Sequence, residues 1–139
     1  MKINLNNYKH KMITNNPIED MLIRIKNGQK ARKQYIFYPK HKVCIRILPI
    51  IYQEGYIKHY SIYNQKTIRI WLKYSNNLPV IKNLSLFFTK KKPIFLSLKK
   101  IWKVDSIFKL LILSTTKGFL SGISAKKKKV GGELMCIIE

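Results

Sequence analysis

The residues best suited to chemistry lie near the carboxyl end of the chain. After an apolar run over 110–113, which predicts a buried strand, comes the polar stretch Ser114-Thr115-Thr116-Lys117-Gly118. Three adjacent hydroxyls can donate to and accept from phosphates, ribose hydroxyls and base edges, and the lysine adds positive charge. Gly118 has no Cβ, so the protein backbone can come close to such a partner. The stretch predicts an RNA-contacting loop, although an ordinary capped surface loop fits the composition equally well.

A basic segment and a glycine pair follow this loop. The run Lys126-Lys127-Lys128-Lys129 has three interpretations, which are a nuclear localisation signal, a solvated face and a phosphate-contacting segment. Gly131-Gly132 predicts a tight turn before a last strand over 134–138. We expect Glu133 to hydrogen-bond locally and hold the hydroxyl loop.

Enzymatic chemistry finds little support in the sequence. Its 6 acidic residues are scattered, so neither a paired general acid and base nor a two-metal cluster is visible. Ser114 has no histidine or aspartate in a recognisable triad context. The 2 cysteines and 3 histidines show no metal-ligand spacing. We therefore predict no enzyme, no metal and no cofactor, and we place Cys44 and Cys136 in the core of a protein from a reducing compartment.

The charge balance indicates a polyanionic partner. A net charge of +22, from 28 basic and 6 acidic residues, disfavours a compact isolated chain, and binding to nucleic acid relieves that repulsion. Apolar residues make up 46% of the chain, which is enough for a core. No apolar stretch approaches the roughly 20 residues that span a bilayer, so we expect no membrane role. Lysine, isoleucine, asparagine, tyrosine and phenylalanine have A/T-rich codons, which hints at an organellar genome.

Helices and hairpins must position these residues. Asn16 and Pro17 predict a helix start, with an apolar face at 18, 21, 22 and 25 and a basic opposite edge that includes Lys30. A strand is expected over 35–38. A helix is expected over 40–53, where Pro49 must kink or shorten it before Gly55 ends it. Runs 56–63 and 67–74 predict a hairpin, whose aromatic residues fit a sheet core better than a platform for stacking bases. A strand over 94–96 and a helical turn within 97–105 follow.

Several motifs resemble the small-subunit ribosomal protein S8 family of bacteria and organelles. The family ends in the pattern I-L-S-T-S-K-G, then a basic segment, then V-G-G-E-L/V-L-C. The matching residues here are Ile112, Leu113, Ser114, Thr115, Lys117, Gly118, Ala125, Val130 to Leu134 and Cys136. The family's opening D-P-I-A-D-M-L-T-R-I-R-N-A resembles residues 16–28, its E-G-Y/F-I resembles 54–57, and its P-V-I-K-G-L resembles 79–84. Departures include Thr116 for the family's serine, Ile107 and Lys109 for its G-x-G, and a non-aromatic end.

The resemblance implies an α+β fold in two small domains. These are an amino-terminal α-β-α-β-β sandwich over 14–74 and a mostly-β, rRNA-binding carboxyl-terminal domain over 80–139. A basic extension over 1–13 precedes them, and a linker over 75–79 joins them.

The resemblance also implies a function. The protein would be a structural constituent of the small ribosomal subunit that binds the central domain of small-subunit rRNA directly, next to other small-subunit proteins, and not as a homo-oligomer. The general alternatives are an RNA chaperone and an mRNA-binding translational repressor. The missing aromatic end, the divergent middle and the lysine-rich extension favour a mitochondrial ribosome over a plastid one. Beyond the loop and the lysine run, the expected RNA-binding residues are Lys30, Lys40, Lys42, Lys90, Lys91 and Lys92.

Overall fold

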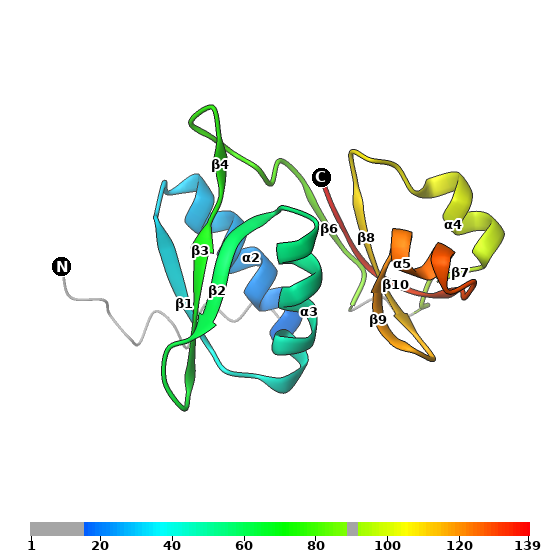
Figure 1. Cartoon of the computed structure of the whole chain (residues 1–139), viewed down its shortest axis with the longest axis horizontal. Coiled ribbons are helices and arrows are strands. Elements are labelled where there is room, and N and C mark those ends of the chain that lie inside the picture. The colour runs from blue at the N-terminus through cyan, green and yellow to red at the C-terminus, as the bar shows by residue number, and fades with distance from the viewer. Residues whose placement is uncertain (1–15, 89–91) are drawn as a thin grey trace.

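The computed structural model of the chain describes residues 16–88 and 92–139. Its first elements are α2 (Pro17–Lys30), β1 (Tyr35–Pro39), α3 (Lys42–Gln53), β2 (Ile57–Ile62), β3 (Thr67–Leu72), β4 (Tyr74–Ser75) and β5 (Leu78–Pro79). Its later elements are β6 (Leu84–Leu86), β7 (Phe95–Leu96), α4 (Leu98–Val104), β8 (Leu110–Thr115), β9 (Gly118–Ser121), α5 (Gly122–Lys127) and β10 (Gly132–Ile138). The fold is α+β in two units, as predicted (Figure 1).

The amino-terminal unit is a three-stranded antiparallel sheet with helices on one face. Its strand order is β1-β3-β2, and with α2 and α3 the chain follows the predicted α-β-α-β-β order. Alternate residues of β3 (68, 70 and 72) are buried against the helices. In Figure 1 the two helices lie between this sheet and the carboxyl-terminal one. The other face of the sheet therefore points away from the second unit.

Helix α2 begins where the sequence predicts. The side chain of Asn16 accepts hydrogen bonds from the backbone N–H groups of Ile18 at 2.9 Å and Glu19 at 3.3 Å. These bonds satisfy donors that a helix start would otherwise leave unpaired. Gly28, which lowers helix propensity, has a packing role. A Cβ there would lie 2.8 Å from a methyl group of Ile36 and 2.9 Å from one of Leu72, so the glycine lets α2 lie close to the sheet.

Helix α3 continues through Pro49 to Gln53, so the proline does not shorten the helix, and the alternative effect, a kink, stays a prediction. Pro49 lies at an exposed position inside the helix. The apolar face of α3 holds the helix in place through Cys44, Ile47 and Ile51, each with 0% exposure. Gly55 ends the helix as predicted, with φ at +83°.

The carboxyl-terminal unit is a sheet in the order β6-β10-β8-β9, and β7 pairs with β10 as well. β8 is buried on both faces. Leu110 and Ile112 join the core beneath α2 and α3, whereas Leu111 and Leu113 join a second core with α4 and α5. Burial on both faces explains why the strand reads as an unbroken apolar run. It also fixes the strand rigidly up to the hydroxyl loop at its end.

The stretch predicted as a linker is itself folded. β4 and β5 form a two-stranded hairpin whose turn residues, Asn76 and Asn77, have φ of +51° and +63°. Asparagine tolerates this left-handed region better than most residues. Just beyond, the backbone N–H of Ile81 donates to the side-chain oxygen of Gln29 at 3.2 Å. The crossing between the two units is thus tied back to α2.

Both cysteines lie in the core, as predicted. Cys44 and Cys136 are free thiols with 0% exposure, and their burial raises the pKa of each to about 12. They stay protonated and out of reach of thiol reagents at neutral pH.

Candidate RNA interface

The predicted hydroxyl loop is the tip of a tight hairpin between β8 and β9. Thr115 pairs with Gly118 in the ladder, so Thr116 and Lys117 alone form the loop. Gly118 has φ at +95°, and a Cβ there would meet nothing within 4 Å. Conformation, not close packing, therefore favours glycine at this position. Residues 116–118 are exposed, as an RNA contact requires.

The three hydroxyls of the loop differ in their surroundings. The Oγ1 of Thr115 accepts a hydrogen bond from the N–H of Lys117 at 3.0 Å and donates one to the carbonyl of Gly118 at 2.8 Å. Thr115 thus holds the hairpin in shape. Ser114 is half-buried and Thr116 is exposed. These two hydroxyls are the better placed to meet a ligand, and the predicted contact of Thr115 stays a prediction.

Gly131 and Gly132 differ from their expected role. The turn before β10 lies at Lys128 and Lys129, and Gly132 is already the first residue of the strand, so the glycine pair does not form the predicted tight turn. They allow close approach instead. A Cβ on Gly132 would lie 2.7 Å from the carbonyl oxygen of Ser114 and 2.7 Å from a methyl group of Thr115. A Cβ on Gly131 would lie 2.5 Å from the carbonyl oxygen of Leu96. The start of β10 therefore packs directly against the hydroxyl loop.

Glu133 lies opposite Ser114 in the β8–β10 ladder and is half-buried. This register places Glu133 beside the strand residue that begins the hydroxyl loop. Among the described residues, no hydrogen bond joins that carboxylate to a loop hydroxyl. Its expected role in holding the loop stays a prediction.

The lysine run divides into one paired residue and three exposed ones. The Nζ of Lys126 lies 2.6 Å from Oδ2 of Asp105 and 4.6 Å from the ring centroid of Trp102. Both side chains of the ion pair are largely buried, at 19% and 4% exposure. Lys126 therefore ties α5 to α4, a role that the sequence pattern did not reveal. Lys127, Lys128 and Lys129 are exposed.

These exposed lysines lie where α5 ends. The N–H of Val130 donates to the carbonyl of Ala125 and that of Lys129 donates to the carbonyl of Lys126, which is the Schellman pattern. Lys129 occupies the left-handed position, with φ at +56°. Only two residues separate Lys129 from Gly132, which packs on the loop. The hydroxyls and the end of α5 consequently lie toward the same end of the carboxyl-terminal sheet, where β8 finishes and β10 begins.

Lys40 and Lys42 border the start of α3. Both are exposed, and His41 caps this helix without any side-chain hydrogen bond. The first turn carries no acidic residue. Free N–H groups and the helix dipole favour an anion there, and the two lysines add to that preference. The predicted contact of Lys40 and Lys42 with RNA phosphates fits this environment.

The remaining predicted lysines are dispersed. Lys30 is exposed at the last position of α2, and in Figure 1 that end of the helix lies away from the β8–β9 hairpin. Lys92 is exposed between β6 and β7. Lys90 and Lys91 lie outside the described residues. The structure thus brings the loop and Lys127 to Lys129 together and leaves Lys30 apart from them.

Residues 16–88 and 92–139 show neither the side-chain grouping of a metal site nor a helix that could span a membrane. In this part of the chain no group of three or more histidine, cysteine, aspartate or glutamate side chains could hold a metal ion. No described helix is long and apolar enough to cross a bilayer.

Comparison with known proteins decides the family. The sequence model of Ribosomal protein S8 matches residues 16–138. The chain belongs to the ribosomal protein S8 family. The small ribosomal subunit protein uS8 of Persephonella marina is 40% identical over 139 residues, covering 91% of this chain and 99% of the relative. That of Buchnera aphidicola is 37% identical over 127 residues, covering 90% and 98%. The small ribosomal subunit protein uS8m of Acanthamoeba castellanii is 37% identical over 122 residues, covering 85% and 94%.

This S8 chain also forms a local turn that its departure from the family pattern put in doubt. Where the family has G-x-G, residues 106–109 make a turn in which the N–H of Lys109 donates to the carbonyl of Ser106 at 3.3 Å. The hydroxyl of Ser106 accepts from the N–H of Phe108 at 3.2 Å. Neither Ile107 nor Lys109 has a positive φ, so the turn does not need the missing glycines.

Proposed function

We propose that this S8 protein is a structural constituent of the small ribosomal subunit that binds the central domain of small-subunit rRNA through the edge formed by Ser114, Thr116 and Lys127 to Lys129. The observation that carries the proposal is the packing of Gly132 on Ser114 and Thr115. This packing supports the proposal because the chain runs from the exposed end of α5 through Gly132 directly onto the strand that carries the loop hydroxyls.

The chemistry of this edge divides between affinity and specificity. The lysines neutralise phosphates and release counterions, which gives affinity with little dependence on sequence. The hydroxyls of Ser114 and Thr116 reach ribose 2′-OH groups and base edges, which give specificity on a distorted RNA helix. The chain acts by holding RNA in place and supports assembly and translation without a reaction of its own.

We further infer that the protein works in a mitochondrial small subunit, next to other small-subunit proteins and as a single copy. The mitochondrial relative of Acanthamoeba castellanii and the A/T-rich coding pattern support this location. Bacterial relatives are equally similar, so the location needs its own test. Co-sedimentation of the tagged chain with mitochondrial small subunits supports it, and co-sedimentation with plastid or cytosolic ribosomes contradicts it.

Tethered cleavage tests the interface directly. Because Cys44 and Cys136 are buried thiols, a single Thr116→Cys substitution offers one reactive site for an RNA-cleaving reagent. Ile107→Cys, at a position that is 88% exposed in the turn before β8, is the matched control. We expect Thr116→Cys to cut the central-domain fragment at one short tract that Ile107→Cys does not cut. Identical cleavage from both sites would remove the assignment of the loop.

A further inference from the structure

The sheet of the amino-terminal unit has a face that no described helix covers. Residues of β1 and β3 alternate between the helices and this open face, where the ladder pairs Tyr35 with Trp71 and Phe37 with Arg69. We call the set Tyr35, Phe37, His59, Tyr63, Arg69 and Trp71 the aromatic face. Its rings adjoin one another, with centroids 4.9 Å apart for Phe37 and Tyr63 and 5.2 Å apart for His59 and Trp71.

Arg69 lies at the centre of this face. Its guanidinium carbon lies 4.6 Å from the ring centroid of Tyr63, 5.1 Å from that of Tyr35, 5.2 Å from that of Trp71 and 5.3 Å from that of Phe37. These distances fall within the range of cation–π attraction. Arg69 fixes the rings in one arrangement while three of them stay open to solvent, since Tyr35 is 40%, Phe37 39% and Tyr63 55% exposed.

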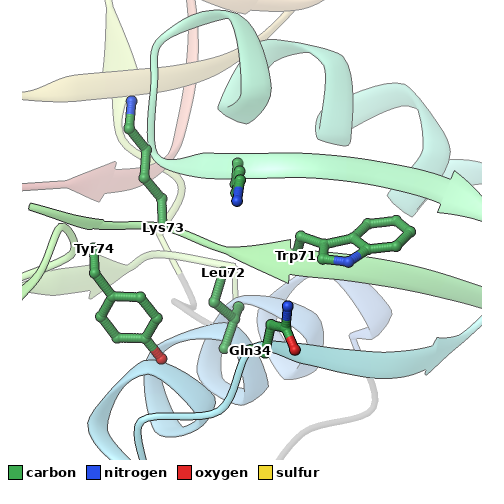
Figure 2. A pocket seen from close by; sticks show the side chains of 6 residues that line it. Gln34, Trp71, Leu72, Lys73 and Tyr74 are labelled. Carbon is green, nitrogen blue, oxygen red and sulfur yellow. The ribbon is translucent and has the colours of Figure 1, made fainter.

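A hollow adjoins the Trp71 end of the face. It has a volume of about 430 Å³ and is lined by Gln34, Lys58, Trp71, Leu72, Lys73 and Tyr74. Figure 2 shows the indole of Trp71 and the side chains of Gln34 and Lys73 around it. An indole can stack on a base, an amide can hydrogen-bond a base edge, and two lysines can hold phosphates. These are the groups that an unpaired nucleotide needs.

Charge favours RNA over a protein as the occupant. None of the chain's 6 acidic residues lies in β1, β2 or β3. Among the described residues, Arg69 forms no ion pair with a carboxylate. The face thus combines exposed rings with uncompensated cations. That combination is typical of proteins that bind single-stranded nucleic acid by stacking.

We propose that the aromatic face is a second RNA site, which binds unpaired nucleotides by stacking bases on Trp71, Tyr35 and Phe37 and by pairing their phosphates with Lys58 and Lys73. Helices α2 and α3 separate it from the carboxyl-terminal sheet (Figure 1), so it contacts a different RNA segment from the hydroxyl loop. One chain then holds two segments of RNA at once.

Fluorescence of Trp71 tests the site. The chain has 2 tryptophans, so in the full-length Trp102→Phe variant Trp71 is the sole tryptophan, and excitation at wavelengths that tyrosine does not absorb isolates its emission. We expect a short single-stranded oligonucleotide to quench this emission saturably, and duplex RNA or polyphosphate to quench it much less. In the same background, Tyr35→Ala with Phe37→Ala removes two of the proposed stacking rings and should weaken oligonucleotide binding about tenfold to a hundredfold. Phe108→Ala, which removes a ring that is 77% exposed elsewhere, should leave it unchanged.

Separate outcomes distinguish this site from the hydroxyl loop. Circular dichroism establishes that each variant is folded, and Tyr35→Phe with Phe37→Tyr, which keeps both rings, should bind like the Trp102→Phe background. Equal quenching by duplex RNA and polyphosphate would reduce the face to a general cation patch and overturn the proposal. Unchanged oligonucleotide binding together with reduced incorporation into the small subunit would assign the face to a protein neighbour and also overturn it. A Ser114→Ala/Thr116→Ala variant should keep the quenching, because the two sites act independently.

Discussion

Replacing Gly132 with alanine should displace the hydroxyl loop. The added Cβ would lie 2.7 Å from the carbonyl oxygen of Ser114, where ordinary contact starts at 3.4 Å, an overlap of 0.7 Å (3.4 minus 2.7). Because the oxygen belongs to the backbone of β8, a strand must shift. Overpacking of this kind costs about 1–3 kcal/mol. For a chain of this size the midpoint of thermal unfolding should fall by roughly 3–10 °C.

Gly131→Ala is the matched control for this change. Its Cβ would meet the carbonyl oxygen of Leu96 at 2.5 Å, which is a clash of similar size beside β7 and α4. Thermal unfolding should show both variants destabilised. Binding at a temperature where both are folded should show that Gly132→Ala alone loses preference for the central-domain rRNA fragment over scrambled RNA. The reasoning fails if Gly132→Ala unfolds like the wild type, or if both variants lose the preference equally.

Three further substitutions test other parts of the account. Lys126→Ala leaves the buried carboxylate of Asp105 without its partner at 2.6 Å and should lower the free energy of unfolding by about 1–3 kcal/mol. Lys127→Ala should change this free energy by less than about 0.5 kcal/mol, and equal effects of the two variants in denaturant titrations would contradict the ion pair. Lys129→Gly removes the steric cost of a side chain in the left-handed conformation and should raise the free energy of unfolding by about 1 kcal/mol. It should also lower the salt slope of RNA binding, and a loss of stability would refute the prediction. Burial raises the pKa of Glu19, so the folded state binds the carboxyl proton more tightly than the unfolded state does. Stability should therefore fall as the pH rises from 4.5 through the raised pKa. In urea titrations Glu19→Gln should lack this fall, and a pH profile like that of the wild type would contradict the prediction.

Local signals predicted much of the fold. Asn16, Pro17 and Gly55 marked helix ends because capping depends on residues close in sequence. The unbroken apolar run of β8 marked a strand buried on both faces. α3 runs past Pro49 because its buried face stabilises the helix beyond what propensity indicates.

The candidate site could be predicted only in outline. The hydroxyl loop and the lysine run were visible as residue types, but the pairing of Lys126 with Asp105 joins residues 21 positions apart (126 minus 105) and needs the fold. The close approach of Gly132 to Ser114 likewise depends on strand register. The sequence favoured a core position for the residues of the aromatic face. Two-residue alternation shows that a strand has two faces, but it does not show which face the helices cover.

The central claim is that hydroxyls of the loop give specificity while nearby lysines give affinity. The most direct test is binding of the full chain to the central-domain rRNA fragment and to a scrambled RNA across a salt series. We expect Ser114→Ala/Thr116→Ala to lose preference for the cognate fragment at an unchanged salt slope. A Lys127→Ala/Lys128→Ala variant should bind both RNAs more weakly, with a slope reduced by about 1.5. If the hydroxyl variant keeps its preference, or if the wild type binds both RNAs alike, the loop does not read RNA and the claim is wrong.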